Sequence, residues 1–349
     1  MISDVRLQNF RSYKDTTFEF EPGVNIVVGP NASGKTNLLE AILVLLKGSS
    51  YRGNDQLVAH GSGWGRLDGS SDSTPRSVLL KKDGEALKKE FHIGGTVLYR
   101  LPFGRRLPVV VFEPSHLQLL TESPDKRRSF IDDVIEQTNP GYERTRRDYK
   151  RTLAQRNALL KRQPSQDQLF VWDVRLSELG AQLAKARQDF ITAQKDRLVE
   201  LYGTLAHKKH IAILKYQSNI ASNDYAGGML RLLKSRLPTD IERGFTTVGP
   251  HRDDIVPLLD EHELMLTGSR GEVRTVLLAL KLLELQAIEA ARDTRPILLL
   301  DDVFSELDGA RRRALTTYLQ DHQTFITTTD ADIVVQHFMD NCHVIPTST

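Results

Sequence analysis

Hydrophobic residues follow two different periods in the first part of the 349-residue chain. Phe18 and Phe20 alternate with polar neighbours, which is the two-residue period of a half-buried strand. A second short apolar run covers residues 24–28, and residues 38–46 continue with helical spacing. We therefore expect strands that lead into a helix.

Glycine, serine and proline positions predict where these elements end. Gly48 follows the last apolar residue of the helical pattern and is typical of a C-terminal cap. Residues 61–75 are rich in Gly, Ser and Pro, so we predict a surface loop there.

From about residue 126 to residue 203 the hydrophobic pattern is that of long helices. A first stripe, interrupted by arginines, comprises Tyr142, Tyr149, Leu153 and Leu160. After a break at residues 163–165, a second stripe alternates spacings of three and four, as in a short coiled coil; it comprises Leu176, Leu179, Leu183, Ala186, Phe190 and Ala193. Two such helices, joined by a turn that contains Pro164, predict an antiparallel hairpin. Two packed core helices of an all-α lobe fit the pattern equally well.

After Pro238 the mixture of strands and helices returns. The pattern predicts helices over residues 272–291 and 311–319, and strands over residues 296–300 and 324–329. The fold class is therefore α/β, with an α-rich insertion. We expect two domains, with the following bounds: an α/β domain from residues 1–120 and 241–349, and a helical domain from residues 121–240.

Composition and charge exclude several classes of protein. Hydrophobic residues make up 40% of the chain, which is enough for a folded core, and the formal net charge is only +2, so any basic binding surface must be local. The single cysteine, Cys342, excludes an internal disulfide and a cluster of thiolate ligands. The N-terminus is charged, and the longest apolar run is far shorter than the roughly 20 residues that span a bilayer. We expect a soluble cytoplasmic protein with no membrane partner.

Residues 29–36 (GPNASGKT) match the phosphate-binding pattern G-x-x-x-x-G-K-[ST] between a predicted strand and a predicted helix. Backbone amides of such a loop converge on phosphate oxygens, and the helix N-terminus adds a positive partial charge. Lys35 is expected to neutralise charge on the β- and γ-phosphates during catalysis, and the Thr36 hydroxyl to ligate Mg²⁺. The residues expected to bind the nucleotide are Pro30, Asn31, Ala32, Ser33, Gly34, Lys35, Thr36 and Asn37.

A second part of a nucleotide site lies at residues 297–302, where a buried strand ends in two carboxylates. Such a strand places its acidic residues at the carboxyl edge of a parallel sheet, next to the phosphate loop. We expect Asp301 to hold Mg²⁺, directly or through water. Asp302 is the candidate catalytic residue that orients or deprotonates the attacking water.

Three further segments, residues 269–272 (SRGE), 305–308 (SELD) and 327–330 (TTTD), narrow the class. With them the chain resembles the ATP-binding-cassette superfamily, which includes the SMC ATPases, and within it the RecF family of DNA replication and repair ATPases. The resemblance extends nearly from end to end. It includes residues 9–13 (NFRSY) and 124–132 (PDKRRSFID), and its most specific blocks are residues 249–254 (GPHRDD) and 300–308 (LDDVFSELD).

The resemblance implies an ABC-type P-loop ATPase head with an inserted helical arm, and an ATP site that is completed only in a homodimer. Ser269 and Gly271 would then contact the γ-phosphate bound to the opposite subunit, and Arg11 would lie near the nucleotide, as would Arg52. Ser269 and Glu272 also match a capping box, which needs no ligand. The implied cofactors are ATP and Mg²⁺.

Some positions depart from the superfamily pattern or have open alternatives. Thr328 and Thr329 stand where transport ATPases have a histidine, so the residue that senses the γ-phosphate is unassigned. Glu113 and Gln118 are candidates for sensing Mg²⁺ or water. His251, with the acidic pair at residues 253–254, suggests a metal site, although a hydrogen-bonded structural turn is the more economical interpretation.

The basic excess is concentrated in the predicted helical arm. Residues 126–162 contain eleven Lys and Arg against five Asp and Glu. Such a segment is typical either of a solvated helix face or of a surface that contacts phosphates independently of DNA sequence. With the RecF resemblance we favour duplex DNA and single-strand/double-strand junctions, and the candidate contacts are Lys126, Arg127, Arg128, Arg144, Arg146, Arg147, Lys150 and Arg151.

The predicted function is that of a RecF-like ATPase of recombinational repair, which dimerises on DNA with ATP, hydrolyses ATP slowly, and supports recombinase loading at single-strand gaps with RecR- and RecO-like partners. An SMC- or Rad50-like structural head is the first alternative. Only about 80 residues of this chain have the pattern of a helical arm, whereas such proteins insert hundreds of residues between the two parts of the head. A transport ATPase subunit is disfavoured by the missing histidine and by the basic arm. A non-hydrolysing, ATP-switched DNA-binding module stays open, because hydrolysis rests on Asp302 alone.

Overall fold

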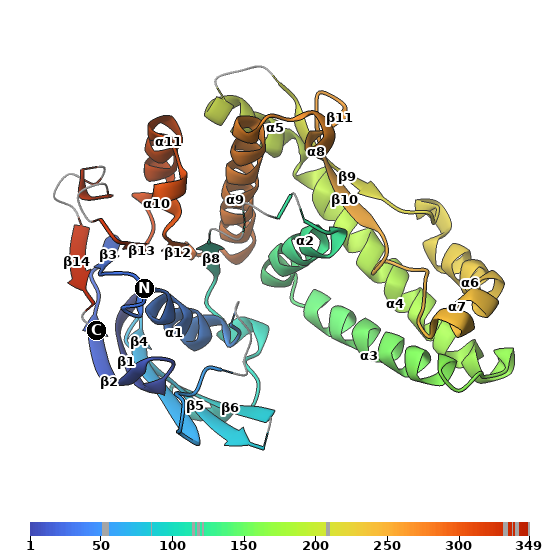
Figure 1. Ribbon diagram of the computed structural model, residues 1–349, viewed down its shortest axis with the longest axis horizontal. Coiled ribbons are helices and arrows are strands. Elements are labelled where there is room, and N and C mark those ends of the chain that lie inside the picture. Colours follow the sequence, from blue (N-terminus) through green and yellow to red (C-terminus); the bar gives the residue numbers. More distant parts are fainter. Residues whose placement is uncertain are drawn as a thin grey trace. The chain divides into compact units, whose positions relative to one another are not determined.

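The computed structural model describes residues 1–50, 56–84, 86–113, 116, 119–120, 122–206, 210–330, 334–336, 338 and 342–347. The chain forms two compact units. Unit 1 comprises Met1–His116 and Ile288–Thr349, and unit 2 comprises Leu117–Ala287 (Figure 1). Each unit has its own hydrophobic core.

Unit 1 contains two β-sheets. The first has the strand order β2-β1-β4-β5-β6-β7 and is antiparallel, and the second has the order β14-β3-β13-β12-β8 and is parallel throughout. The strands of the antiparallel sheet are β1 (Ile2–Phe10), β2 (Tyr13–Glu19), β4 (Trp64–Ser71), β5 (Thr74–Asp83), β6 (Ala86–Ile93) and β7 (Thr96–Leu98). Those of the parallel sheet are β3 (Val24–Val28), β8 (Val109–Phe112), β12 (Ile297–Asp301), β13 (Thr324–Thr328) and β14 (Cys342–Pro346). The strand predicted over residues 24–28 is confirmed with the same ends, and those predicted over residues 296–300 and 324–329 are confirmed with ends shifted by one residue.

Helix α1 (Lys35–Lys47) lies between the two sheets and contacts strands of both (Figure 1). Its side chains are buried on all sides, as expected of a helix whose apolar residues are not confined to one face. The predicted C-terminal cap is confirmed. Gly48 adopts a left-handed conformation with φ 81°, and its N–H donates to the carbonyl of Val44. The other helices of unit 1 are η1 (Phe103–Arg105), α10 (Val303–Glu306) and α11 (Gly309–Leu319).

The prediction of a surface loop over residues 61–75 is wrong, because most of this segment forms β4 and the start of β5. Gly65 and Gly69 face the backbone of β1 so closely that a Cβ would lie 2.7 Å from the carbonyl oxygen of Asn9 and 2.5 Å from that of Asp4, respectively. These glycines allow two strands to approach each other closely. Amino-acid composition alone does not distinguish this role of glycine from its role in loops. A tight turn at residues 72–73, both with positive φ, joins the strands.

Unit 2 is mainly helical and also contains a three-stranded antiparallel sheet of order β11-β10-β9. Its helices are α2 (Pro124–Thr138), α3 (Tyr142–Leu160), α4 (Gln166–Ala193), α5 (Lys195–Ala206), η3 (Ser222–Asp224), α6 (Tyr225–Ser235), α7 (Leu237–Arg243), α8 (Leu264–Thr267) and α9 (Arg270–Arg292), the last of which continues into unit 1. Its strands are β9 (Ala212–Gln217), β10 (Asp254–Leu259) and β11 (His262–Glu263).

Helices α3 and α4 form the predicted antiparallel hairpin (Figure 1). Thr145 bonds to Gln182 while Arg156 bonds to Asp173, so the two helices run in opposite directions. The predicted stripes are largely buried in the core of the unit, except that Ala193 is exposed and Ile191 is buried in its place. Helix α4 also contacts α6, so the hairpin is part of the core of unit 2 rather than a free coiled coil.

The C-terminal bound of unit 2 differs from the expected one. We placed the return to the α/β domain at residue 241, whereas the contacts of residues 241–287 lie within unit 2. Strand β10 pairs with β9 along its whole length, and the Asp254 carboxylate is bound by Arg127 of α2. These pairings are long-range in sequence, which is why the hydrophobic periods did not reveal them.

None of the helices in the described part of the chain is both long enough and apolar enough to cross a membrane.

Candidate nucleotide-binding site and basic residues

The phosphate loop joins β3 to α1 at the carboxyl edge of the parallel sheet of unit 1. Ala32 and Gly34 both have left-handed backbone conformations, with φ 67° and 93°, which turn the amides of the loop inward as in known anion-binding nests. A Cβ at Gly34 would lie 2.8 Å from the Tyr13 hydroxyl and 3.1 Å from the Ser12 hydroxyl, so the loop requires glycine there. The Lys35 ammonium group is nearly buried and donates to the carbonyls of Gly29 and Pro30, at 2.7 and 2.8 Å.

The carboxylate of Asp301 connects the acidic strand to the phosphate loop. The Thr36 hydroxyl donates to Asp301 Oδ1 at 2.9 Å, and the Thr327 hydroxyl donates to the same oxygen at 2.7 Å. The register of the sheet explains the second contact, because Asp301 and Thr327 are direct partners in the parallel pairing of β12 with β13. A buried carboxylate beside a threonine hydroxyl is an oxygen donor set of the kind that Mg²⁺ prefers, so the residues present fit this ion.

Asp302 follows this carboxylate in a left-handed conformation with φ 50° and begins helix α10. Its N–H donates to the Thr327 hydroxyl at 3.0 Å. Aspartate tolerates this region better than most residues, although such a backbone still costs about 1 kcal/mol or more and needs support from its surroundings. The hydrogen bond to Thr327 supplies that support.

Thr327 is the site residue that the sequence analysis missed. We considered Thr328 and Thr329 as candidates for the γ-phosphate sensor, but the Thr328 hydroxyl is part of a local turn with the backbone of Asp330, at 3.0 and 3.1 Å. Thr327 instead holds both acidic residues of the neighbouring strand. The signal that could have identified it is its position near the carboxyl end of a predicted strand of the same α/β domain, where polar residues gather at the edge of a parallel sheet.

Arg11, which we expected near the nucleotide, is bound by a carboxylate of helix α1. Its guanidinium group makes two parallel hydrogen bonds to Glu40, at 2.7 and 2.8 Å, and the Glu40 side chain is fully buried. Ser50 also donates to this carboxylate. A contact between Arg11 and the nucleotide stays a prediction. Arg52 lies outside the described residues.

Asn37 and Glu113 both make local contacts in unit 1. The Asn37 amide donates to the Ser12 hydroxyl at 2.9 Å and so links α1 to the turn between β1 and β2. The N–H of Glu113 donates to His116 Nδ1 at 3.2 Å, and the Glu113 carboxylate lies 3.5 Å from His116 Nε2. Gln118 lies outside the described residues, so the sensing of Mg²⁺ or water by these positions stays a prediction.

Ser269 and Gly271 stand at the start of α9, in unit 2. The capping box is confirmed. The Ser269 N–H donates to the Glu272 carboxylate at 2.8 Å, and the Glu272 N–H donates to the Ser269 hydroxyl at 3.3 Å. Ser269 is exposed, so the cap leaves it accessible to a second molecule. The γ-phosphate contact stays a prediction.

Residues 249–254 form a hydrogen-bonded turn, as the structural interpretation predicts. His251 Nδ1 shares a hydrogen bond with the Tyr149 hydroxyl at 2.7 Å, and burial lowers the pKa of His251 to about 4. Asp253 accepts hydrogen bonds from the hydroxyls of Tyr216, Ser218 and Tyr225, at 2.5, 2.8 and 2.6 Å. In the described part of the chain, no cluster of three or more His, Cys, Asp and Glu residues is arranged to hold a metal ion.

The eight basic residues proposed for DNA divide into two groups. Arg127, Arg128 and Arg146 are mostly buried and bind carboxylates of unit 2. Arg127 holds Asp254 with two bonds, Arg128 contacts Asp125 and the carbonyl of Asp253, and Arg146 lies between the carboxylates of Asp132, Asp133 and Glu136. The exposed group comprises Lys126, Arg144, Arg147, Lys150 and Arg151. Removing a buried arginine of this kind would leave its carboxylates unpaired, so DNA contacts stay a prediction for the exposed group alone.

Comparison with known proteins identifies the family. A family model described as an AAA domain matches residues 4–221. The DNA replication and repair protein RecF of Acetivibrio thermocellus is 34% identical, with 98% of this chain and 97% of its own length aligned. That of Moorella thermoacetica is also 34% identical, over 98% of this chain and 94% of its own. The chain belongs to the RecF family. The predicted resemblance is confirmed.

Solved structures extend this result to the fold of RecF. Two structures of the recombination mediator protein RecF of the RecFOR pathway, named RecF-ATPrS and RecF-ATP, are each 30% identical to this chain, with TM-scores of 0.84 and 0.85. They align with 95% and 94% of this chain and with 92% of their own. An SMC head bound to a domain of ScpA, 16% identical over 96% of this chain and 91% of its own, has a TM-score of 0.55 and shows likeness of fold alone. The expected ABC-type ATPase head is confirmed.

Proposed function

We propose that this RecF-family protein binds ATP and Mg²⁺ in unit 1, dimerises with ATP on duplex or gapped DNA, and hydrolyses ATP slowly to release the DNA. It would support recombinase loading at single-strand gaps together with RecR- and RecO-like partners in the cytoplasm. The observation that carries this proposal is the hydrogen bond from Thr36 to Asp301, because it joins the phosphate loop to the acidic strand.

The residues of unit 1 have distinct parts in the proposed reaction. The loop amides and Lys35 would bind the phosphates of ATP. Thr36 and Asp301 would hold Mg²⁺, which neutralises charge on the β- and γ-phosphate oxygens when bound. Asp302 would orient the attacking water or accept its proton. Thr327 keeps both aspartates in position for these tasks.

Mass measurement by light scattering, with and without ATP, tests the dimer. The wild type is expected to double its mass with ATP, whereas Lys35→Ala and Ser269→Arg stay monomeric. Asp302→Asn is expected to bind ATP and to accumulate as a dimer on DNA. Ser235→Arg, an equal change at an exposed position of α6, is the control for Ser269→Arg and should dimerise normally. A wild type that stays monomeric with ATP would contradict the shared site.

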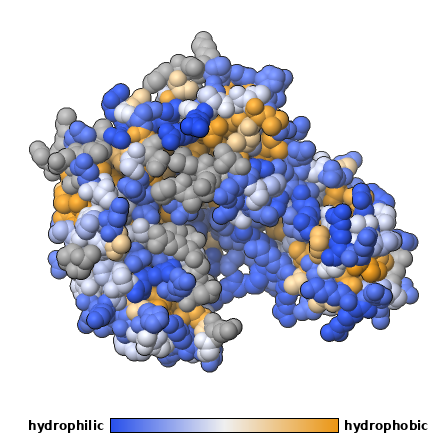
Figure 2. Space-filling model, viewed as in Figure 1, coloured by the Kyte–Doolittle hydropathy of each residue, from blue (hydrophilic) through white to orange (hydrophobic). Residues whose placement is uncertain are grey.

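The salt dependence of DNA binding tests the basic surface. Figure 2 shows a surface that is largely hydrophilic with scattered hydrophobic patches, and α3 carries four of the five exposed cations. Each phosphate contact contributes about −0.9 to the slope of log K against log salt. Five contacts per protomer therefore predict a slope of about −4.5, against about −7 for all eight.

Two variants separate the exposed from the buried cations. Lys150→Ala is expected to reduce the slope by about 0.9 per bound copy, because it removes one phosphate contact. Arg146→Ala is expected to leave the slope unchanged and to lower the free energy of unfolding, since Arg146 is engaged inside unit 2. Equal effects of the two variants on the slope would show that the division is wrong.

A further inference from the structure

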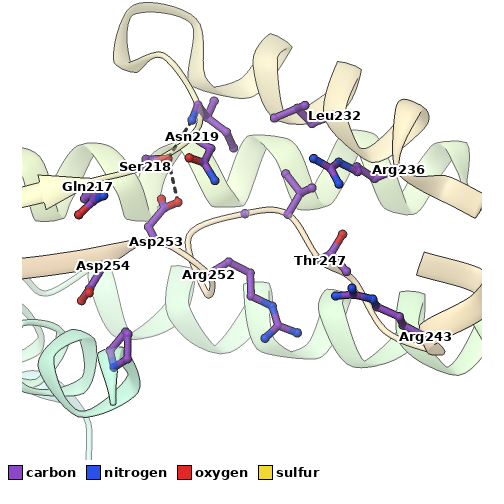
Figure 3. Close-up of a pocket in the computed structure, with 14 residues that line it drawn as sticks. Gln217, Ser218, Asn219, Leu232, Arg236, Arg243, Thr247, Arg252, Asp253 and Asp254 are labelled. Carbon is purple, nitrogen blue, oxygen red and sulfur yellow. Dashed lines mark hydrogen bonds between the residues drawn. The ribbon is translucent and has the colours of Figure 1, made fainter. Parts of the chain in front are cut away.

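Unit 2 contains a pocket of about 750 Å³ that is lined by none of the residues assigned to the proposed ATP site. It lies between the end of β9, the α6–α7 segment and the turn over residues 247–254 (Figure 3). A volume of this size is typical of sites for small molecules or nucleotides.

The charges of this pocket are separated into two ends. Figure 3 shows Arg236 and Arg243 on the side that also contains Thr247, Asp253 and Asp254 on the opposite side, and Arg252 between them. The three arginines come from three places in the chain: the junction of α6 and α7, the last residue of α7, and the turn before β10. All three side chains are exposed.

The acidic end does not neutralise the arginines. Asp253 is saturated by three hydroxyl donors, and Asp254 is paired with Arg127 through two hydrogen bonds. Among the ion pairs of 4.0 Å or less that the described residues make, none includes Arg236, Arg243 or Arg252. The three arginines therefore have no carboxylate partner within 4.0 Å among the described residues.

One of these arginines is already held in place. Arg252 lies over the ring of Phe245, 4.9 Å from its centroid, and donates to the carbonyl of Thr246 at 3.2 Å. A guanidinium group oriented in this way loses less entropy when it binds an anion. The remaining wall is mixed, with the amides of Gln217 and Asn219 and the apolar side chains of Ile220 and Leu232.

We propose that this pocket binds the phosphate monoester of a nucleotide. A terminal phosphate carries a charge of about −1.5 to −2 and three free oxygens, so arginine side chains lining one pocket favour it over a carboxylate or an internal phosphodiester. The amide and apolar wall would accommodate the sugar and base. The nucleotide is either the end of a DNA strand or a free mononucleotide, and the first source rests on the proposed DNA-binding function.

Two titrations distinguish these sources. The first compares, by fluorescence anisotropy, otherwise identical DNA duplexes with a single-stranded extension whose 5′ or 3′ ends carry either phosphate or hydroxyl. The second measures, by calorimetry and without ATP, binding of deoxythymidine monophosphate against deoxythymidine, with Lys35→Ala added to every protein so that the phosphate loop is not expected to bind the ligand. Both compare the unchanged pocket with Arg236→Ala/Arg243→Ala, Arg243→Lys, and the control Lys234→Ala, which removes an exposed charge from the end of α6, outside the pocket.

We expect the unchanged pocket to prefer a phosphorylated ligand by about tenfold, which is typical of charge-assisted hydrogen bonds. The double variant should reduce the preference to less than about twofold, Arg243→Lys should reduce it partly, and Lys234→Ala should retain it. A preference for phosphorylated DNA ends would identify the end of a DNA strand as the ligand. Binding of deoxythymidine monophosphate without a preference among DNA ends would identify a free mononucleotide. Failure to bind DNA would contradict the proposed function, while the monophosphate titration still decides the pocket.

Two results would overturn the proposal. One is an unchanged pocket that shows no preference for phosphate in either titration. The other is a double variant that loses overall DNA affinity but keeps the preference, since the arginines would then act only through general electrostatic attraction.

Discussion

Replacement of Thr327 by valine is the most direct test of how the acidic residues of unit 1 are positioned. The substitution keeps the branched shape and removes only the hydroxyl, which is fully buried. Two hydrogen bonds disappear: the one donated to Asp301 at 2.7 Å and the one accepted from the N–H of Asp302 at 3.0 Å. A bond to a carboxylate contributes about 1.5–3 kcal/mol and a neutral one about 0.5–1.5 kcal/mol. We therefore expect a loss of about 2–4 kcal/mol in the free energy of unfolding.

The effect on ATP hydrolysis follows from the same contacts. Asp302 loses the partner that supports its left-handed backbone, and a shift of about 1 Å in a catalytic group costs about 100-fold in rate. Steady-state hydrolysis should therefore fall by about 10- to 100-fold. Binding of ATP should change by less than about threefold, because its phosphate contacts are those of the loop amides and Lys35.

Thr328→Val is the matched control, since among the described residues the Thr328 hydroxyl bonds to the backbone of Asp330 and not to the acidic pair. This variant should hydrolyse ATP within about twofold of the wild-type rate. Its two lost neutral hydrogen bonds predict a loss of about 1–3 kcal/mol in the free energy of unfolding, so hydrolysis is the measurement that separates the two variants. The reasoning is refuted if Thr327→Val matches the wild type in both hydrolysis and denaturant unfolding, or if the two variants are equally impaired in hydrolysis.

Three further substitutions test the fold. Arg156→Ala should lower the free energy of unfolding by about 3–5 kcal/mol, because it leaves two buried carboxylates unpaired, whereas the exposed Arg151→Ala should stay within about 0.5 kcal/mol; equal urea midpoints would contradict this. His251, whose pKa is lowered from 6.5 to about 4 by burial, should cost the wild type about 2 kcal/mol of stability between pH 8 and pH 5, because the unfolded chain takes up the proton first. His251→Asn should lack this loss, and parallel pH profiles would refute it. Gly69→Ala should destabilise by about 2 kcal/mol, as its Cβ would meet a backbone oxygen of β1, and Gly63→Ala, with open space, should not; similar thermal midpoints would contradict the close approach.

Local patterns were sufficient wherever the physics is local. The phosphate loop was identified because a strand, a glycine-containing turn and a helix follow each other within a few residues, and the cap at Gly48 rests on one backbone conformation. The capping box at Ser269 is equally local. Contacts between adjacent strands are harder to predict from sequence. The role of Thr327, for example, depends on the register between β12 and β13.

Glycine composition was misleading where glycine serves packing. Gly65 and Gly69 stand in a segment whose composition is that of a loop, yet both are buried in an antiparallel sheet. Their effect is visible only when β1 is placed beside them, at a distance that excludes a Cβ. The alternation of buried and exposed residues in β4 is present in the sequence, but its small buried residues do not register as hydrophobic.

Local net charge overstated the basic surface for a related reason. The carboxylate that pairs with Arg127 is 127 positions away in the sequence, and Arg156 reaches acidic residues 17 and 84 positions away. A window of residues 126–162 counts the arginines of such pairs and leaves out the acids. Arg146 and Arg156, which interrupt the apolar stripe of α3, are therefore part of the reason that the stripe packs. The net charge of a helical domain indicates its capacity to bind anions only after the arginines and lysines paired with internal carboxylates have been left out of the count. In unit 2 the cations that remain are the exposed ones, including those of α3 and the three arginines of the pocket.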